Sequence, residues 1–586
     1  MDNGGEGVGR QKKQSFLQGA AILGAAALLV KLIGAMFKIP LMNLIGGVGM
    51  GDFTIAYDIF RPFSALAVAG LPVAVSKLVS ESAATGRLRD VRRILRLSMA
   101  LFFAGGLLAS ACMFFGARRF AAALGSPDSF LSIAALSPAL FFCCMMSAYR
   151  GYYQGLNNMV PTAASQVIEA LCKLVGGTAL AVFFMRFAAR GLPVPGSPLW
   201  QLYGTAGGRV QISEFGAVGA VLGVTLSTAC GALFLFLRHH LGGDGISRGE
   251  LQRAPGPESR RRLLKKMIRI ALPVCLGSLA VHLTSFIDLL SIMNRLEHAL
   301  RLDEGALLSS YRGLIPEGYS HAQTAKFLYG CYSGIAVNIF NLIPSLVAAL
   351  GVSILPAVAG AWAAGRRREA GRSIESMLRV TALMVFPAGC GLMALSEPVC
   401  MLLYGARPQE AKIAAMLLRS LALPMVLVSL STPVNAVLQA VGRVDTPVRL
   451  MVAGGALKLG LNFLLVGQPQ LNIQAAPVGT LACYLLIVLC SLRVLKNAAG
   501  LQLSYGKIFL KPLLAAFLCG LAAYTAYGLL GRLLQSRWTT VLAILTGAGF
   551  YLAILLLSRT LKREDILMLP KGEKIAKILE KHGMIG

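Results

Sequence analysis

The chain has 586 residues, of which 56% are hydrophobic and only 14% are charged. About a quarter of the residues of a soluble domain are charged, so this composition indicates an integral membrane protein. The formal net charge is +30, but the basic residues lie in short segments between apolar runs, as the positive-inside rule describes, and this pattern argues against nucleic-acid binding.

The first apolar run follows a polar, basic segment (residues 1–15) and extends over nearly thirty residues. The apolar region of a secretion signal has about 7–15 residues, so this run is expected to remain as a membrane span. The twelve cysteines lie mostly inside apolar runs and form no CxxC pair. They are expected to be packing residues, and the sequence indicates neither a metal site nor a cofactor.

Apolar runs long enough for a helix to cross about 30 Å of hydrocarbon recur along the whole chain. Fourteen are found, at 16–44, 53–81, 92–116, 129–153, 160–186, 214–238, 264–295, 322–363, 372–395, 410–441, 446–466, 473–495, 508–532 and 537–559. We therefore predict an all-α integral membrane protein with fourteen transmembrane helices.

The connections between these runs alternate in charge. Segments such as 87–93 (RLRDVRR) and 366–372 (RRREAGR) are rich in arginine, whereas 45–52 and 467–472 carry no basic residue. The positive-inside rule then places both termini in the cytoplasm of a multi-pass protein of the cytoplasmic membrane.

The two halves of the chain repeat each other weakly. Residues 57–93 (YDIFRPF…ATGRLRDVRR) resemble 337–372 (VNIFNLI…AAGRRREAGR), and 152–177 resemble 437–461, where Lys173 lies opposite Lys458. A duplication of six spans in the same orientation predicts a pseudo-twofold, two-lobed transporter with a central cavity.

The expected organisation follows from this repeat. It comprises a cytoplasmic N-terminus (1–15), an N-lobe of spans 1–6 (16–238), a basic cytoplasmic linker (239–263), a C-lobe of spans 7–12 (264–495), two extra spans without a repeat partner (496–559) and a cytoplasmic tail (560–586).

Three basic residues of the predicted spans 1 and 2 lie away from the cytoplasmic end of span 2, where Lys77 and Glu81 are expected to form an interfacial pair. Lys31 is near the middle of span 1, and Lys38 follows two helical turns later on the same face. Span 2 adds Asp58 and Arg61, three residues apart. A charged side chain at the bilayer centre costs about 2.5–3.5 kcal/mol and almost always faces the bundle interior. Three cations beside one anion therefore predict a cavity that binds phosphate or pyrophosphate.

Simpler interpretations of the same residues stay open. Lys38 can extend its ammonium to the interface, Lys31 can belong to a structural ion pair, and Asp58 with Arg61 can form an internal pair at spacing i,i+3. Further spans contain other polar residues, for which the sequence suggests several roles.

Glu169 and Lys173, four residues apart in span 5, are expected to neutralise each other. Asp288 in span 7 is a candidate for a coupling-ion site or a buried, satisfied carboxyl group. Asn338 and Asn341 occupy the repeat positions of the charged pair in span 2, so the second lobe lacks those charges.

Several stretches resemble one known family. YRGYYQGLNNMVPTAASQVIE (149–169), GLPVAVSKLVSE (70–81) and LPVCLGSLAVHLTSFIDLLSI (272–292) are similar to the MOP exporter superfamily, in particular to its polysaccharide-transport branch of stage V sporulation protein B and MurJ-like lipid II flippases. The resemblance extends over nearly the whole chain. It implies fourteen helices, alternating access, export of undecaprenyl-pyrophosphate-linked precursors, and a cavity containing Lys31, Lys38 and Arg61.

The predicted function is therefore that of a flippase for a lipid-linked oligosaccharide with an anionic pyrophosphate headgroup. The chain has no GxxxxGK[ST] motif for ATP, so the membrane potential or a coupling ion, Na⁺ or H⁺, is expected to drive transport. No bond is made or broken, and the chain is not expected to be an enzyme.

Two alternatives remain. An ion-coupled multidrug antiporter of the same superfamily binds organic cations and needs cavity carboxylates, for which Asp58 and Asp288 are candidates. A membrane glycosyltransferase acting on the same lipid needs a catalytic acidic pair on a sizeable external loop, and the loop 296–321 contains four acidic residues but no DxD motif.

Overall fold

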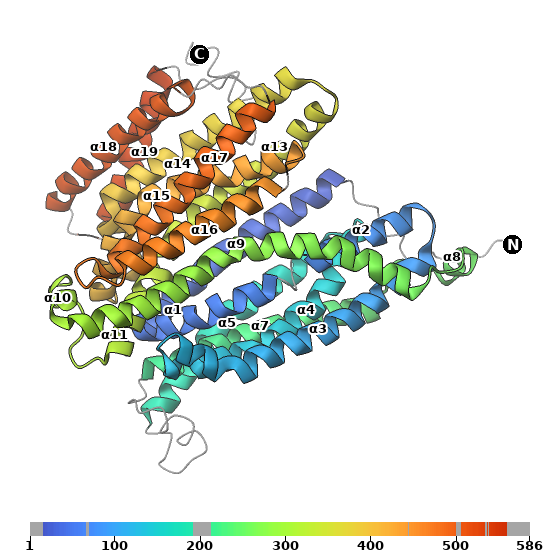
Figure 1. Ribbon diagram of the computed structural model, residues 1–586, viewed down its shortest axis with the longest axis horizontal. Helices are drawn as coiled ribbons and strands as arrows, with labels where there is room; N and C mark the ends of the chain where they lie inside the picture. The colour runs from blue at the N-terminus through green and yellow to red at the C-terminus, as the bar shows by residue number, and fades with distance from the viewer. Residues whose placement is uncertain are drawn as a thin grey trace. The chain divides into compact units, whose positions relative to one another are not determined.

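The computed structural model describes residues 16–65, 70–190, 212–443, 445–499, 506–533, 536 and 538–558. Within these ranges every regular element is a helix (Figure 1). The chain forms two compact units, Met1–Leu289 and Leu290–Gly586, which we call unit 1 and unit 2. The predicted cytoplasmic ends, 1–15 and 560–586, lie outside the described residues.

Unit 1 contains the first predicted spans. Its helices are α1 (Phe16–Ala65), α2 (Leu71–Ala84), α3 (Leu88–Ala123), η2 (Pro127–Ser129), α4 (Phe130–Gly155), α5 (Val160–Ala189), α7 (Ile212–Gly242), α8 (Arg248–Arg253) and the first part of α9 (Arg260–Leu302).

The long helix α1 is two helices joined at a glycine. Gly46 has a φ of 67° and a ψ of −175°, outside the helical region. A side chain at positive φ is strained, whereas glycine adopts this conformation freely. The sequence predicted a loop over 45–52, but the structure changes direction at a single residue and divides α1 into 16–45 and 47–65.

Glycines allow α5 and α7 to pack with their backbones in contact. A Cβ atom at Gly223 would overlap the backbone of Gly177, and a Cβ atom at Gly219 would overlap the carbonyl of Leu180. Membrane helices gain van der Waals contact in this way, because lipid supplies little hydrophobic drive for their association. This packing fixes α5, which carries two of the predicted site residues.

Unit 2 contains the remaining helices. They are the last part of α9, α10 (Glu304–Ser309), α11 (His321–Tyr329), η3 (Gly330–Ala336), α12 (Val337–Phe340), α13 (Leu342–Ala363), α14 (Arg367–Tyr404), α15 (Pro408–Ala440), α16 (Asp445–Leu465), η4 (Asn472–Ala475), α17 (Ala476–Ala499), η5 (Gly506–Leu510), α18 (Lys511–Leu533) and α19 (Trp538–Leu557). The predicted span 8 is interrupted, because η3 is a π-helix and α12 ends after one turn.

The described residues contain twelve helices that are long and apolar enough to span a membrane, or thirteen when the bent helix α9 is counted as one span. The sequence predicted fourteen. The difference lies in α1, because residues 22–65 count as one continuous helix although Gly46 divides them. The prediction of an all-α, multi-span membrane protein is confirmed.

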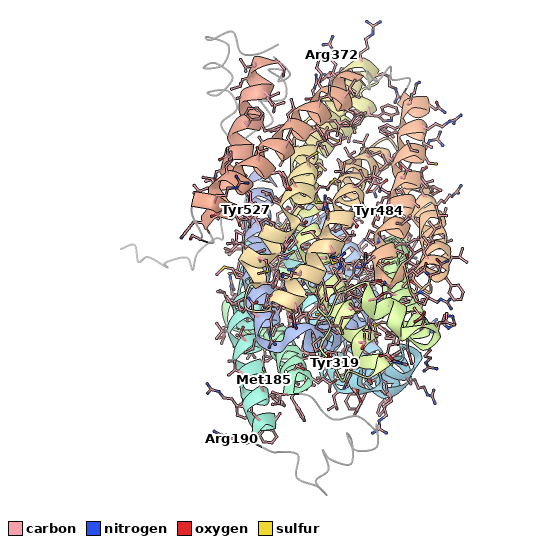
Figure 2. All side chains as sticks on the ribbon, turned by 90° about the vertical axis from the view of Figure 1, so that its left-hand side faces the viewer. Met185, Arg190, Tyr319, Arg372, Tyr484 and Tyr527 are labelled. Atoms are coloured by element: carbon pink, nitrogen blue, oxygen red, sulfur yellow. The ribbon has the colours of Figure 1, made fainter. Side chains whose placement is uncertain are left out.

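The two ends of unit 2 carry different loops. Arg372 on α14 and Tyr319 in the segment before α11 lie at opposite ends of the unit (Figure 2). The outward faces of α18 and α19 between the ends are apolar, with exposed residues such as Phe517, Leu545 and Leu552. Exposed leucine and phenylalanine along a span are suited to contact with lipid.

Both units contain the same glycine turn before a long helix. Gly86 precedes α3 with a φ of 71°, and Gly365 precedes α14 with a φ of 73°. In each turn the following arginine donates its amide hydrogen to the carbonyl oxygen five residues earlier, at 2.8 Å for Arg87 and 2.9 Å for Arg366. These equal backbone geometries support the repeat predicted from the sequence.

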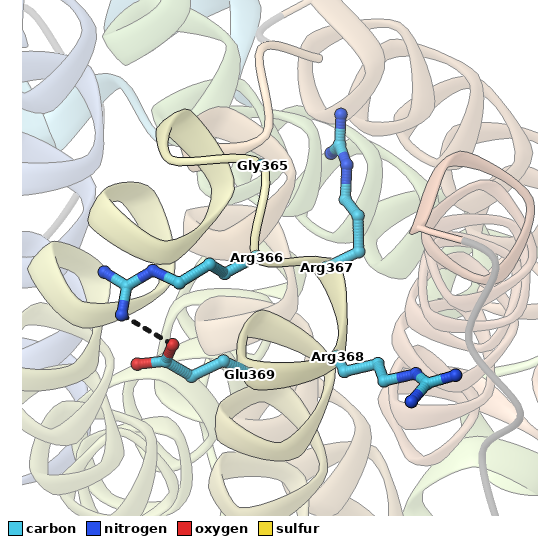
Figure 3. A pocket seen from close by; sticks show the side chains of 5 residues that line it. All are labelled: Gly365, Arg366, Arg367, Arg368 and Glu369. Atoms are coloured by element: carbon cyan, nitrogen blue, oxygen red, sulfur yellow. Dashed lines mark ion pairs between the residues drawn. The ribbon is translucent and has the colours of Figure 1, made fainter.

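The side chains of the two turns also match. Arg87 forms an ion pair with Asp90 at 2.7 Å in unit 1, and Arg366 forms one with Glu369 at 2.8 Å in unit 2 (Figure 3). The surroundings of the two acids differ: the Asp90 side chain is 2% exposed and that of Glu369 is 56% exposed.

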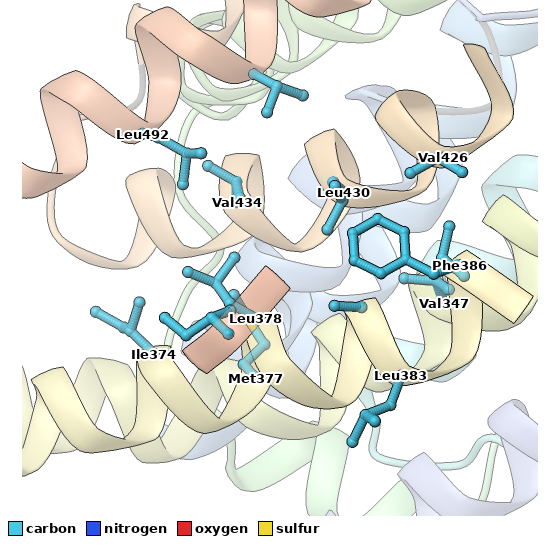
Figure 4. Packing of buried hydrophobic residues seen from close by; sticks show 14 of the residues in the cluster. Val347, Ile374, Met377, Leu378, Leu383, Phe386, Val426, Leu430, Val434 and Leu492 are labelled. Carbon is cyan, nitrogen blue, oxygen red and sulfur yellow. The ribbon is translucent and has the colours of Figure 1, made fainter. Parts of the chain in front are cut away.

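The core of unit 2 holds α19 against α14. Ile374, Leu378 and Phe386 of α14 belong to a buried cluster that also contains Tyr551 and Leu555 of α19. Figure 4 shows the α14 side chains packed toward those of α15. The Tyr551 hydroxyl donates to the Leu383 carbonyl oxygen at 2.9 Å, so the last helix has a fixed register on α14.

Candidate functional site

The second half of α1 presents a charged pair inside unit 1. Arg61 Nη1 donates to Asp58 Oδ1 at 2.6 Å, as the spacing of three residues on one helix allows. The Asp58 side chain is 1% exposed, whereas that of Arg61 is 32% exposed. The internal pair is therefore present, and it buries the anion while leaving part of the cation accessible.

Lys173 on α5 supplies a second cation next to this pair's helix. Its ammonium donates to the Tyr57 hydroxyl at 2.6 Å and lies 4.7 Å from the centre of the Tyr57 ring and 5.3 Å from that of Phe37. Aromatic faces attract cations through their quadrupole, most strongly where water is scarce. The two halves of α1 and α5 thus meet around one ammonium group.

Lys38 adds a third cation to the group. It lies one residue after Phe37 on the first half of α1 and is partly buried. Its ammonium interacts electrostatically with Arg61, Lys173 and Asp58. The structure therefore brings Lys38, Arg61 and Lys173 into one neighbourhood with the carboxylate of Asp58, and we call these four residues the cationic cluster.

Lys31 lies farther along the same helix. It is exposed, two turns before Lys38, or about 10 Å along the axis. Its neighbours on the helix surface include Leu28 and Leu32, which are also exposed. Among the described residues, the interactions found for Lys38 involve Arg61, Lys173 and Asp58 rather than Lys31.

Glu169 does not neutralise Lys173 as the sequence predicted. Its carboxylate accepts from Arg150 Nη2 at 2.9 Å, and Arg150 Nε donates to the Ser165 hydroxyl at 3.0 Å. One planar guanidinium spans both partners because Ser165 and Glu169 lie four residues apart on the same face of α5. The prediction considered one helix only, whereas α4 supplies a partner with more donors.

This pairing explains the stretch that carries the family resemblance. Arg150 belongs to YRGYYQG at the end of α4, and Ser165 and Glu169 belong to PTAASQVIE at the start of α5. The conspicuous charged residues of the stretch tie the two helices together. They leave Lys173 to interact with the aromatic side chains of α1.

Helix α9 contributes three further polar residues to unit 1, namely Asp288, Thr284 and His282. The predicted coupling-ion candidate Asp288 is partly buried on α9, and Thr284 one turn earlier is buried. His282 is partly buried and interacts electrostatically with Arg61. The charge of Arg61 therefore acts on His282 of α9 as well as on Lys38 of α1.

The repeat positions in unit 2 are neutral. Asn338 lies in α12 and donates to the Tyr404 hydroxyl at 3.5 Å. Asn341 is exposed and begins α13. Unit 2 therefore has no charge at the repeat positions of Asp58 and Arg61.

Sequence reasoning missed several buried charges. Lys326 in α11 is fully buried, although it lies only five residues after the start of an amphipathic helix. Arg379 and Asp52 are also buried, and Ser129 donates to Asp52 Oδ1 at 2.5 Å. Their burial is set by neighbouring helices, which no local pattern encodes.

The cationic cluster can stabilise an anion. It contains three cations and one carboxylate, and guanidinium and ammonium groups are the usual protein donors to phosphate oxygens. The Arg61 guanidinium makes one hydrogen bond in the described part of the chain, through Nη1, and it has five N–H donors in all.

Two family models match the chain. The model described as "Polysaccharide biosynthesis protein" matches residues 16–194, and the model described as "MatE" matches residues 333–464. These matches confirm the resemblance to the MOP exporter superfamily that the sequence indicated.

The chain is similar over nearly its whole length to two proteins of Bacillus subtilis (strain 168). It is 22% identical to "Stage V sporulation protein B", with 95% of this chain and 98% of the relative covered. It is 24% identical to "Lipid II flippase MurJ", with 92% and 94% covered.

Solved structures support the same fold. The inward closed conformation of a lipid II flippase MurJ matches with a TM-score of 0.61 at 13% identity, covering 91% of this chain and 98% of that chain. An inward-facing multidrug resistance MATE family transporter matches with a TM-score of 0.59 at 14% identity, covering 82% and 99%. At these identities the likeness shows the fold.

Proposed function

We propose that the chain is a flippase that moves an undecaprenyl-pyrophosphate-linked cell-wall or polysaccharide precursor across the cytoplasmic membrane. The observation that carries this proposal is the cationic cluster of Lys38, Arg61, Lys173 and Asp58 on three helical segments of unit 1. The name of one relative, a lipid II flippase, supports the same class of substrate.

The excess of cations is the physical reason for an anionic substrate. Charged residues inside a membrane protein are costly unless they are paired or serve a ligand. The Asp58 carboxylate offsets one of the three positive charges, and a diphosphate would offset the others. A substrate that is itself a cation would meet repulsion from Lys38 and Lys173.

Binding would use the accessible side of Arg61. The guanidinium keeps its bond to Asp58 through Nη1 while its remaining N–H groups donate to phosphate oxygens. Lys38 and Lys173 then supply point charges from the first half of α1 and from α5. Lys31, two turns before Lys38, is positioned to attract the headgroup along the same helix.

The driving force of this cycle is electrical. An inside-negative membrane potential favours the outward movement of negative charge by about 2.3 kcal/mol per charge per 100 mV. We place both termini in the cytoplasm on the positive-inside rule, so the headgroup enters on the side of the arginine-rich turns and leaves on the other side by alternating access.

The test is a transport assay in vesicles that contain the purified chain and a lipid-linked diphosphate. The variants Lys38→Ala, Arg61→Ala and Lys173→Ala should each lower the rate of appearance on the far leaflet by about tenfold or more, because a hydrogen bond to a charged group contributes about 1.5–3 kcal/mol.

Lys77→Ala is the matched control, because it removes one positive charge from the same unit. Lys77 forms only a loose ion pair with Glu81 at 3.9 Å, and both side chains are more than half exposed. Its transport rate should stay at the level of the unmodified chain. Equal rates for all four variants at equal protein levels would overturn the proposal.

The second candidate is an ion-coupled antiporter of organic cations. It is favoured by the match of residues 333–464 to the MatE model and by the buried carboxylate of Asp58. This function predicts that Asp58→Asn abolishes efflux of a cationic dye from the vesicles and that Lys173→Ala leaves it intact. The lipid flippase predicts no dye efflux in either case.

A further inference from the structure

The linker that follows α7 is docked on the glycine turn of unit 1. Arg89, three residues after Gly86, donates to two consecutive backbone carbonyls, those of Leu251 and Gln252, each at 2.9 Å. Leu251 and Gln252 lie in the last turn of the short helix α8, so the arginine fork binds main-chain oxygens at a helix end rather than one side chain.

The end of the linker is held at the same place. The Glu258 amide donates to Asp90 Oδ1 at 2.7 Å, and the Glu258 carbonyl accepts from Arg93 Nη1 at 2.8 Å. Asp90 is thereby buried beneath the linker. Arg89, Asp90 and Arg93 together bind residues 248–258. We call residues 248–258 the linker segment; they are part of the predicted linker 239–263.

Unit 2 contains the same arrangement of residues in its own glycine turn, and there the side chains are exposed. Arg368, Glu369 and Arg372 stand at the positions of Arg89, Asp90 and Arg93 in the repeated turn, and all three are exposed. A pocket of about 440 Å³ is lined by Gly365–Glu369, and the side chains of Arg367 and Arg368 point away from the Arg366–Glu369 pair (Figure 3). The same donors and acceptor are therefore present in unit 2, and their side chains are exposed.

The end of the chain carries a second copy of the linker pattern. Residues 563–573 (REDILMLPKGE) match the linker segment (RGELQRAPGPE) in order and spacing: arginine first, an acidic residue third, an aliphatic residue fourth, proline eighth and glutamate eleventh. Two aliphatic residues follow five and six positions after each glutamate, Leu263 and Leu264 in one copy and Ile578 and Leu579 in the other.

The place where α19 ends allows this segment to reach the open turn. Leu555, two residues before the end of α19, lies in the same buried cluster as Ile374 and Leu378 in the first turns of α14. Residues 558–562 can extend over about 16 Å at about 3.3 Å per residue. The six residues from Arg368 to Ile374 rise by only about 9 Å.

We propose that residues 563–573 dock on the turn Gly365–Arg372 of unit 2 in the way that the linker segment docks on the turn of unit 1. Arg368 then donates to main-chain carbonyls near Ile566, Glu369 accepts the amide of Glu573, and Arg372 donates to the carbonyl of the same residue. The inference concerns the chain's own C-terminal segment, and it does not depend on the proposed transport function.

The direct test is photo-crosslinking of the full-length chain in lipid nanodiscs. p-Benzoylphenylalanine in place of Arg368 should crosslink to a peptide within 563–573 of the same chain. The matched control places the same probe at Arg89, where it should crosslink to 251–258. A mixture of isotope-labelled and unlabelled chains separates links within a chain from links between chains.

Crosslinks from position 368 that fall only outside 563–573, or only on a second chain, would overturn the proposal. A second measurement covers the case in which the probe disturbs the turn. Removal of residues 563–586 should raise amide hydrogen exchange at 366–370 at least about tenfold and leave exchange at 87–91 unchanged, because only the former turn loses its cover. Equal exchange with and without the tail would also overturn it.

Discussion

The helix that carries Asp58 and Arg61 in unit 1 has a neutral counterpart in unit 2, where Asn338 and Asn341 stand at the repeat positions. In unit 1 the Arg61 guanidinium lies 2.6 Å from the carboxylate of Asp58 on the same helix. Asn338 instead contacts the Tyr404 hydroxyl at 3.5 Å, and Asn341 is exposed at a helix break. The spans are repeated in both units, whereas this charged pair is present in unit 1 alone.

A second pair shows the same difference. Arg150 on α4 bonds Glu169 on α5 in unit 1, and the repeat positions in unit 2, counted from Lys173 and Lys458, are Asn435 and Gly454. A Cβ atom at Gly454 would lie 2.9 Å from the Cys483 sulfur, so α17 leaves little room for an acidic side chain there. Backbone geometry is thus repeated more faithfully than electrostatics, which fits a division of labour between the units.

The largest effect is expected when the charged pair of unit 1 is replaced by the asparagines found at the repeat positions of unit 2. The double variant Asp58→Asn/Arg61→Asn should lower flipping by about 100-fold, because it removes a cation that contributes about 1.5–3 kcal/mol to a charged ligand and disturbs the remaining cluster. The same vesicle assay measures the rate. The reciprocal variant Asn338→Asp/Asn341→Arg should not restore transport to this background, and full restoration would contradict the division of labour.

The ion pair between Arg150 and Glu169 can be tested by its contribution to the stability of unit 1. Arg150→Gln should destabilise the chain by about 2 kcal/mol, since it leaves the partly buried Glu169 without its cation. The midpoint of thermal unfolding in detergent reports the loss. Arg150→Gln/Glu169→Gln should recover part of it, and Lys77→Gln, at an exposed pair, should change it by no more than about 0.5 kcal/mol. An unchanged midpoint for Arg150→Gln would show that the bond does not tie α4 to α5.

The two glycine turns allow a matched pair of substitutions. Gly86→Ala and Gly365→Ala each place a Cβ atom at positive φ with no other atom within 4 Å. Each should therefore lower stability by about 1–2 kcal/mol through backbone strain alone. Thermal midpoints that fall by the same amount confirm equivalent turns, and a loss confined to one glycine would show that the turns differ.

The smallest effect is expected from protonation of Asp244, which lies at the start of the linker after α7. Burial opposes ionisation of Asp244, but donation from Arg92, the Ile246 amide and the Tyr152 hydroxyl outweighs it and holds the pKa of Asp244 below its ordinary value. The stabilisation is complete above the unfolded-state pKa of about 3.9 and is lost as pH falls through the lower folded value. His239 is the other titratable neighbour.

Amide exchange of residues 243–247 should consequently stay slow from neutral pH down to about pH 4 and rise below it, after correction for the intrinsic rate. Asp244→Asn should remove this rise. A rise that persists in that variant would contradict the assignment of the effect to Asp244.

Much of the fold could be predicted from the apolar runs, because a bilayer forces each run of about twenty residues into a helix. The glycine-rich segment after Leu44 was the exception: it was expected to be a loop, and a single positive φ at Gly46 lets helix continue on both sides. The repeat was also readable, since the residues of the turns before α3 and α14 align directly.

The candidate site was predictable only in part. Lys38, Arg61 and Asp58 could be selected because charge inside an apolar run is conspicuous. The partners could not be selected: Glu169 bonds Arg150, and Lys173 bonds Tyr57, because the choice depends on which helices are neighbours. The assignment of these residues to a substrate remains a prediction.

The central claim is that the cationic cluster of unit 1 binds a diphosphate. The most direct test is equilibrium binding of a lipid-linked pyrophosphate to the purified chain, measured by native mass spectrometry for the unmodified chain, for Lys38→Ala/Arg61→Ala/Lys173→Ala and for Lys77→Ala. We predict an affinity at least about 100-fold weaker for the triple variant and unchanged for Lys77→Ala. An unchanged affinity for the triple variant would contradict the claim.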